Sequence, residues 1–198
     1  GQNNPFDFDL NYQPAPGIQR FLVGTTPMLS MLAMEEALTP LLDAGMDALR
    51  AKSILMTDYA SFLTDQLLRL CFDFTVQRLY PNNHPTKSER ITLTAVGGYG
   101  RGEMALHSDI DIGFLTPWKQ TGWVEQVIES ILYMLWDLGL KVGHSSRSLD
   151  DMVRMAKSDL TICTAQLEAR YIWGDQLLYE EAAARFDREV QSGTGRSF

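Results

Sequence analysis

Residues 91–115 carry two stretches of alternating apolar and polar side chains, separated by a glycine-rich turn. The first stretch, residues 91–96, and the second, residues 109–115, both show the period of two that is typical of β-strands. The glycines between them are Gly97, Gly98, Gly100 and Gly102. The pattern therefore predicts two strands joined by a turn in which no Cβ shields the backbone from a ligand.

The chain before this pair of strands shows helical spacing. Residues 1–24 are rich in Pro, Asn and Gln, which predicts an extended arm. Residues 25–86 predict an N-terminal helical region, in which Thr39-Pro40 marks a second helix start and Gly45 is a weak point. We therefore expect an arm and a helical region to precede the strands.

The chain after the second strand predicts a small sheet followed by more helices. An amphipathic helix over residues 121–138 and a third strand over residues 140–146 follow the second strand. Helical spacing then returns over residues 149–155, 160–173 and 175–190. We expect an α+β fold with its core in residues 87–158 and a C-terminal helical extension over residues 159–198.

The composition excludes several classes of protein. Lys and Arg number 17 against 25 Asp and Glu, which gives a net charge of −8. This charge argues against a general nucleic-acid binder, but not against binding one nucleotide whose phosphates a metal neutralises.

Cys71 and Cys163 lie outside any CxxC, so neither a disulfide framework nor a zinc site is predicted. No apolar run approaches the ~18 residues of a membrane span, and the first residues, GQNNPFDFDL, lack the basic and apolar regions that are expected of a signal peptide. We expect a soluble cytoplasmic protein, and the initial Gly is expected of a processed chain or of a piece of a longer one.

Asp109 and Asp111 stand at the start of the second predicted strand. Alternation along a strand places both carboxylates on one face, with Cα atoms roughly 7 Å apart. Carboxylates at this separation repel each other unless a cation lies between them, and Mg²⁺ prefers one or two carboxylates plus substrate phosphates. The backbone of Gly97 and Gly98 would then hold the phosphates that the metal bridges. The arrangement supports phosphoryl or nucleotidyl transfer.

The combined motif is more specific than either of its parts. It is not a Walker A motif, because GxxxxGK[ST] is absent, and it is not a Rossmann turn, because the GxGxxG spacing is broken and no long helix follows. A hydrophobic-Gly-Gly step, ten residues, and then Asp-hydrophobic-Asp-hydrophobic resembles the signature of the polymerase-β-type nucleotidyltransferase superfamily. This resemblance implies a polymerase-β-like core built on a small mixed sheet.

Longer segments resemble the N-terminal nucleotidyltransferase domain of the family of bifunctional PII uridylyltransferase/uridylyl-removing enzymes. The segments are AVGGYGRGEMALHSDIDIGFL, ILYMLWDLGLKVGHSSRSLDD and SDLTICTAQLEARYIWGDQLLYEE. The resemblance implies Mg²⁺-dependent transfer of UMP from UTP to a tyrosine hydroxyl of the PII signalling protein, with release of pyrophosphate. It also implies an HD-type phosphohydrolase domain that removes UMP and two ACT domains that sense glutamine, none of which these 198 residues include.

The resemblance further implies roles for individual residues. Asp109 and Asp111 would be the metal ligands, and Gly97 and Gly98 would contact the triphosphate. Two further residues match the family motif and would assist phosphate binding or orient the aspartates; they are Arg101 and Ser108.

Several points stay open from the sequence alone. Many members of the superfamily carry a third carboxylate on the strand after the crossing helix, and LKVGHSSR has none, so the general base is unassigned. His144, Glu103 and Asp150 are candidates for it. Arg147 could touch the triphosphate or pair with Asp150 or Asp151. The alternative functions are a nucleotidyltransferase with another NTP or acceptor, and a fragment that binds nucleotide without catalysis.

Overall fold

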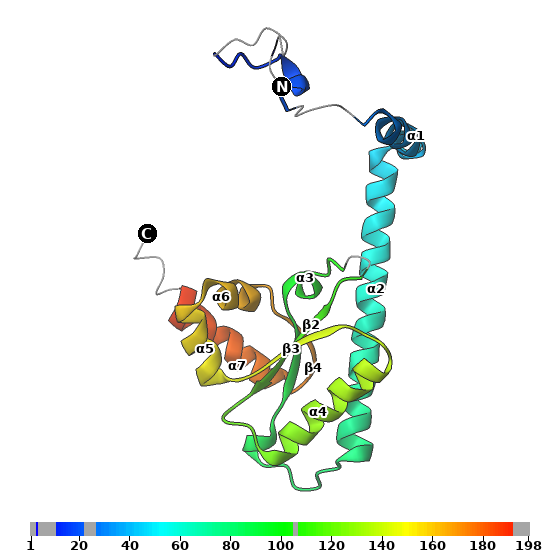
Figure 1. The fold of residues 1–198 in the computed structure, drawn as a ribbon. Coiled ribbons are helices and arrows are strands. Elements are labelled where there is room, and N and C mark those ends of the chain that lie inside the picture. The colour runs from blue at the N-terminus through cyan, green and yellow to red at the C-terminus, as the bar shows by residue number, and fades with distance from the viewer. Residues whose placement is uncertain (1–2, 4–10, 22–26, 105–106, 192–198) are drawn as a thin grey trace. The chain divides into compact units, whose positions relative to one another are not determined.

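The structure, a computed structural model, describes residues 3, 11–21, 27–104 and 107–191 (Figure 1). The chain separates into two compact units, residues 1–53 and 54–198, and each is described by itself. Much of the predicted arm over residues 1–24 lies outside the described residues. Within its described part, the 3-10 helix η1 covers Gly17–Phe21.

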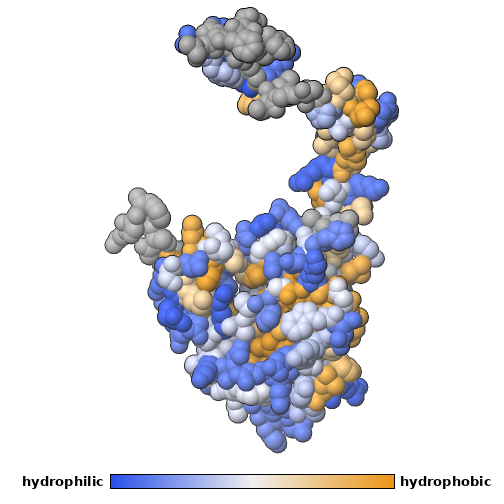
Figure 2. Space-filling view, viewed as in Figure 1, coloured by the Kyte–Doolittle hydropathy of each residue, from blue (hydrophilic) through white to orange (hydrophobic). Residues whose placement is uncertain are grey.

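Helix α1 (Met28–Ala44) differs from the sequence-based expectation at its C-terminal end. The second helix start predicted at Thr39-Pro40 is wrong, because Pro40 lies inside α1 and the break falls at Gly45. The exposed helix tolerates Pro40 because water can satisfy the carbonyl that loses its N–H partner. Gly45 has a φ of 78°, a left-handed conformation that suits glycine. None of the α1 residues is buried, and Figure 2 shows hydrophobic side chains on its surface.

A four-stranded mixed sheet lies at the centre of the second unit, with strand order β3-β2-β1-β4. Strand β1 is antiparallel to both of its neighbours, whereas β2 and β3 are parallel. The predicted α+β fold with a small mixed sheet is therefore confirmed. The strands are β1 (Thr92–Ala95), β2 (Ile110–Thr116), β3 (Val142–Ser148) and β4 (Arg170–Gly174).

The structure corrects the predicted elements mainly at residues 170–174, which form strand β4. We expected a helix over residues 160–173, but helix α6 covers only Leu160–Leu167, and the residues that follow pair with β1. The sequence RYIWG is rich in β-branched and aromatic residues, which suit a sheet, and Ile172 is fully buried in the core. Pairing with β4 also covers the second edge of β1, which would otherwise leave its backbone groups open.

The remaining elements connect or cover the strands. The predicted crossing helix is α4 (Gly122–Asp137), which Thr121 caps by accepting a hydrogen bond from the Val124 N–H. None of the helices in the described part of the chain combines the length and apolarity that a bilayer crossing requires. The other helical elements are α2 (Met46–Phe74), η2 (Thr75–Leu79), η3 (Lys87–Glu89), α3 (Gly97–Gly100), α5 (Leu149–Ser158), α7 (Gln176–Phe186) and η4 (Asp187–Gln191).

The two faces of the sheet have different coverings. Ile112 and Phe114 of β2 join a core cluster with α4 and α2, whereas Leu115 joins a second cluster with α5 and α7. Because successive side chains of a strand point to opposite faces, Asp111 shares the face of Leu115. The face that carries Asp111 is therefore the one opposite α4.

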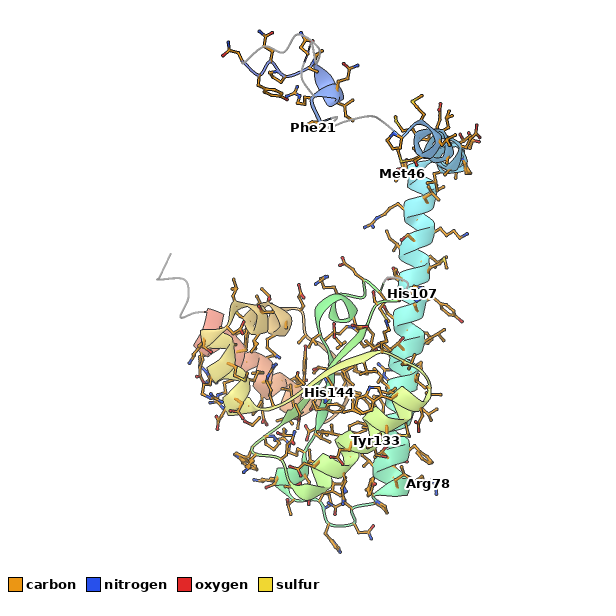
Figure 3. The ribbon with its side chains drawn as sticks, in the orientation of Figure 1. Phe21, Met46, Arg78, His107, Tyr133 and His144 are labelled. Atoms are coloured by element: carbon orange, nitrogen blue, oxygen red, sulfur yellow. The ribbon has the colours of Figure 1, made fainter. Side chains whose placement is uncertain are left out.

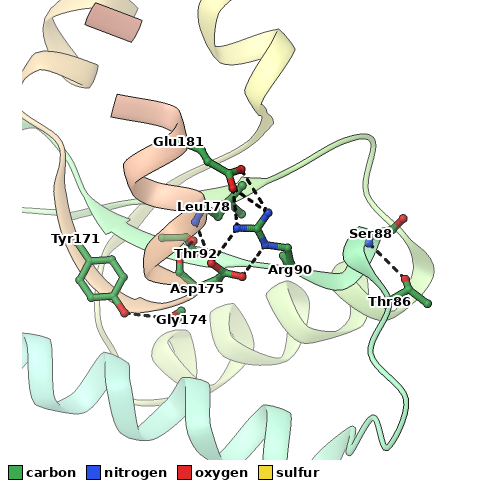
Figure 4. Close-up of polar contacts among 9 residues, drawn as sticks. All are labelled: Thr86, Ser88, Arg90, Thr92, Tyr171, Gly174, Asp175, Leu178 and Glu181. Carbon is green, nitrogen blue, oxygen red and sulfur yellow. Dashed lines mark hydrogen bonds and ion pairs between the residues drawn. The ribbon is translucent and has the colours of Figure 1, made fainter. Parts of the chain in front are cut away.

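Arg90 fixes the start of β1 to helix α7 (Figure 4). Its guanidinium binds Asp175 through two hydrogen bonds of 2.6 and 3.1 Å, and it reaches Glu181 at 3.3 Å. These bonds lower the pKa of the Asp175 carboxyl. Asp175 also accepts a hydrogen bond from the Leu178 N–H, which caps α7. This network holds the end of β1 that lies away from the glycine turn.

Candidate active site

The glycine turn and the start of β2 lie side by side. The turn follows β1 as the short helix α3, and the Val96 N–H that precedes it donates to the Asp111 carbonyl at 3.0 Å. Gly97 has a φ of 59°, and a Cβ placed on it would lie 3.4 Å from Oδ2 of Asp111. The structure thus brings the glycine turn and the second aspartate into contact.

The two predicted metal ligands differ in their surroundings. Asp109 is exposed and lies just before β2, which begins one residue later than expected, whereas Asp111 is half-buried within the strand. Burial, and then the negative charge of Asp109, raise the pKa of the Asp111 carboxyl. Neither carboxylate forms an ion pair or hydrogen bond with a described residue. A half-buried carboxylate whose ionisation is opposed by burial and by a neighbouring carboxylate, with no protein cation bound to either among the described residues, forms a site suited to a divalent metal ion.

The chemistry of the donor set fits Mg²⁺. Across residues 3, 11–21, 27–104 and 107–191, no group of three or more His, Cys, Asp or Glu side chains could hold a metal ion. A metal at Asp109 and Asp111 would therefore take its other ligands from water and substrate phosphates. Mg²⁺ binds in this manner, with one or two carboxylates and several retained oxygens from outside the protein.

Gly143 makes room for the Asp111 side chain, and sequence reasoning missed it. Gly143 of β3 pairs with Asp111 in the parallel register, and a Cβ on Gly143 would collide with Oδ1 of Asp111. The available signal was a glycine in the interior of a predicted strand, which often marks a close approach by another group. The absence of a Cβ at Gly143 therefore accommodates the Asp111 carboxylate.

Replacing Gly143 with Ala is expected to displace the Asp111 carboxylate. We expect a loss of about 1–3 kcal/mol in the free energy of unfolding from overpacking, and a fall of roughly 10²-fold in nucleotidyl transfer from misplacement of the metal ligand. Gly122→Ala is the matched control, because a Cβ at Gly122 meets no atom within 4 Å. Thermal melts and labelling rates measure both effects, and equal behaviour of the two variants would contradict the role of Gly143.

Arg101 and Ser108 lie at the two ends of the loop that joins the glycine turn to β2. Arg101 forms ion pairs with Glu103 at 2.8 Å and with Glu168 at 2.7 Å. Its Nη2 would lie 3.8 Å from a Cβ on Gly98, so the guanidinium rests beside the turn. Ser108 is exposed next to Asp109, while residues 105–106 between the two ends lie outside the described residues.

Tyr99 anchors the glycine turn in the interior, through a cluster that the sequence reasoning also missed. Its hydroxyl donates a 2.6 Å hydrogen bond to Asp65 of α2, and Arg170 of β4 donates to the same carboxylate at 2.6 Å. The Arg170 guanidinium also lies 5.4 Å from the centre of the Tyr99 ring. Burial, and then the bond to Asp65, raise the pKa of the Tyr99 hydroxyl. Asp65 could have been noticed as an acid on the buried stripe of α2, together with Ser61, Leu68 and Phe72.

The structure places the candidate general bases away from the Asp111 carboxylate or engages them elsewhere. His144, labelled in Figure 3, pairs with Ile112 and packs edge-on against Trp136 of α4, on the sheet face opposite Asp111. Asp150 forms an ion pair with Arg185 at 2.6 Å. Glu103 is held by Arg101. The general base therefore stays unassigned.

Arg147 of β3 lies on the same sheet face as Asp111. It pairs with Leu115 in the parallel register, four residues further along β2 than Asp111, and it is half-buried. The predicted alternative of a pair with Asp150 or Asp151 is not formed, since Arg185 and Arg154 bind those carboxylates. Contact between Arg147 and a phosphate stays a prediction.

A separate cavity of about 480 Å³ lies at the opposite end of β1, near Ile91 and Trp123. Its carboxylates are already engaged, because Arg90 binds Asp175 and the Thr86 N–H donates to Glu89. It lacks the unpaired acids that a metal–phosphate site needs, so Asp109 and Asp111 remain the candidate site.

A glycine turn at the end of one strand, beside paired aspartates that open the next, defines the class as nucleotidyltransferase. Residues 34–147 match the family of nucleotidyltransferases described as DUF294, and the chain belongs to this family.

Comparison with curated proteins finds bifunctional uridylyltransferase/uridylyl-removing enzymes. The chain is 63% identical to the enzyme of Novosphingobium aromaticivorans and 59% identical to that of Erythrobacter litoralis, over 138 residues in each case. It is 53% identical to the enzyme of Rhodospirillum rubrum. Each match covers 70% of this chain and 15% of the relative, so the chain spans a small part of their length.

Among solved structures, the crystal structure of a toxin–antitoxin with AMP-PNP matches with a TM-score of 0.36 and 18% identity. That match covers 52% of this chain and 77% of the other.

Proposed function

We propose that this chain is the transferase part of a cytoplasmic uridylyltransferase that moves UMP from UTP to a tyrosine hydroxyl of a PII-type signalling protein. Mg²⁺ is the proposed metal and pyrophosphate the second product. The approach of Gly97 to the Asp111 carboxylate carries this proposal, because it puts backbone that no Cβ shields next to an acid without a protein cation among the described residues. The choice of UTP and of a PII-type acceptor is supported by the names of the relatives and by the motifs shared with that family.

The proposed reaction uses few groups of this chain. The acceptor hydroxyl oxygen forms a bond to the α-phosphorus, and the bond from that phosphorus to the bridging oxygen of the β-phosphate breaks. The hydroxyl proton passes to solvent, and pyrophosphate leaves from the side of Gly97 and Gly98. A divalent cation bound by Asp109 and Asp111 would supply charge neutralisation at the α-phosphate. Arg101, directly after the turn, and Ser108, next to Asp109, would contact the phosphate chain.

Labelling with each of four α-³²P nucleotides in the presence of Mg²⁺ tests this function. We expect UTP, and no other NTP, to label a PII-type protein, and we expect pyrophosphate to appear in equal amount. A PII variant with Phe in place of the acceptor Tyr is the control. Labelling from another NTP or onto another acceptor would support the first alternative, and nucleotide binding without pyrophosphate release would support the non-catalytic one.

A thermal-shift series identifies the preferred base without an acceptor. A ligand at 100 times its Kd stabilises the folded state by about 2.7 kcal/mol, which corresponds to roughly 5–11 °C for a chain of this size. We expect this shift with UTP and Mg²⁺ and smaller shifts with ATP, GTP and CTP. Equal shifts with all four nucleotides would contradict selection of uracil by this part of the enzyme.

A further inference from the structure

Residues 168–170 hold the glycine turn from two sides, although the proposed reaction uses none of them. The Glu168 carbonyl packs so closely on Gly100 that a Cβ there would collide with it. Two residues later, Arg170 binds Asp65, which also accepts a hydrogen bond from the Tyr99 hydroxyl. The connection between α6 and β4 therefore packs against the turn through its backbone and is joined to it through the Arg170 and Asp65 side chains.

The Glu168 side chain makes a further contact, with Arg101. Two nitrogens of the Arg101 guanidinium are occupied, Nε by Glu103 at 2.8 Å and Nη1 by Glu168 at 2.7 Å. The third nitrogen, Nη2, lies beside Gly98 and makes no hydrogen bond within the described part of the chain. A guanidinium is a rigid planar fork, so fixing two of its nitrogens also fixes the direction of the third.

The two carboxylates differ in how firmly they can hold Arg101. The Glu103 side chain is 67% exposed, and the Glu168 side chain is 32% exposed. An exposed ion pair is weakened by water and salt, whereas a more shielded one is weakened less. The Glu168 backbone also packs against Gly100 of the turn, which places its carboxylate close to Arg101. Glu103 accepts a hydrogen bond from Arg101, and Glu168 adds a second restraint that is less screened by solvent.

We propose that Glu168 is a positioning residue that holds Arg101 with its free Nη2 directed toward the phosphate chain of the nucleotide. This inference rests on the proposed function and deepens it by assigning a residue that orients the phosphate contact. An unrestrained arginine side chain would lose rotamer freedom when it bound a phosphate, and orientation in advance removes that cost. Glu168 acts through Arg101 and touches no substrate itself.

A double-mutant cycle on nucleotide affinity tests this role. Isothermal titration of the 198-residue chain with UTP and Mg²⁺ would compare Glu168→Gln, Arg101→Met and the double variant with the unsubstituted chain. We expect Glu168→Gln to weaken UTP binding about 3- to 10-fold and to leave UMP binding within about twofold, because UMP lacks the β- and γ-phosphates. In the Arg101→Met background, the same substitution is expected to have no further effect.

Each other outcome of the cycle has a defined meaning. Tighter UTP binding by Glu168→Gln would show that the carboxylate competes with the nucleotide, and would overturn the proposal. An equal loss with and without Arg101 would show a structural role only, and would also overturn it. Glu129→Gln, an exposed substitution on α4, is the control and should leave both affinities unchanged. Failure of the unsubstituted chain to bind UTP would overturn the proposed function, and this inference with it.

Discussion

Asp111→Asn is expected to abolish nucleotidyl transfer and at the same time to stabilise the metal-free protein. Loss of a metal ligand removes several kcal/mol of transition-state stabilisation, which corresponds to a rate decrease of about 10³-fold or more. The raised pKa of Asp111 means that its carboxyl holds a proton more tightly in the folded than in the unfolded chain. The free energy of unfolding therefore falls as the pH rises from the carboxyl pKa of the unfolded chain through the raised pKa of the folded chain. At neutral pH the ionised Asp111 exerts its full destabilising effect.

The amide of Asn carries no charge, so the variant avoids this cost. We expect a gain of about 0.5–2 kcal/mol in the free energy of unfolding at pH 7 in EDTA, the range typical when functional strain is relieved. Asp137→Asn, an exposed change at the end of α4, is the control and should alter neither rate nor stability appreciably. A destabilised Asp111→Asn variant, or one with near-normal transfer, would contradict the assignment of this carboxylate.

Asp65→Ala is expected to produce the largest loss of stability among these variants. Removal of the carboxylate leaves the Tyr99 hydroxyl and the Arg170 guanidinium without their shared partner. Loss of one member of a buried ionic cluster lowers the free energy of unfolding by about 3–5 kcal/mol. Because Arg170 is partly exposed, we expect a smaller loss of about 2–3 kcal/mol. The melting temperature should then fall by roughly 4–12 °C.

The control for Asp65→Ala is Asp58→Ala, an exposed position on the same helix. We expect it to change the free energy of unfolding by less than about 0.5 kcal/mol. Transfer activity at a temperature where both variants remain folded should fall only in Asp65→Ala, because the glycine turn is then less firmly held. Similar melting temperatures for the two variants would show that the cluster contributes little.

The part of the site that could be predicted from the sequence is the part made by neighbours in the chain. The alternating side chains of β2 and the glycines before it were sufficient to predict that the glycine turn lies beside Asp111, because both follow from local backbone geometry. Gly143 and Asp65 could not be placed, since their roles depend on contacts across the sheet and with a distant helix. The same holds for Glu168, which forms an ion pair with Arg101 although the two are 67 positions apart in the chain.

The fold shows the same division between local and distant causes. Helix α4 was predicted within one residue at each end, because its cap and its apolar stripe are local signals. The prediction of a helix that includes the residues of β4 was wrong. Their strand conformation is imposed by pairing with β1, more than 70 residues earlier in the chain. Pro40 led to the prediction of a helix start that the structure does not have. An exposed helix accepts proline, although this residue usually starts or breaks a helix.

The bond between Asp65 and Arg170 joins residues that are 105 positions apart. During synthesis, the ribosome delivers the aspartates and the glycines well before the arginine that steadies them. The nascent chain therefore carries every proposed metal and phosphate ligand while one edge of β1 is still open. Contacts over such long separations form slowly, and unpaired strand edges favour association with other chains. A protein expressed without its last 30 residues would remain in that incomplete state.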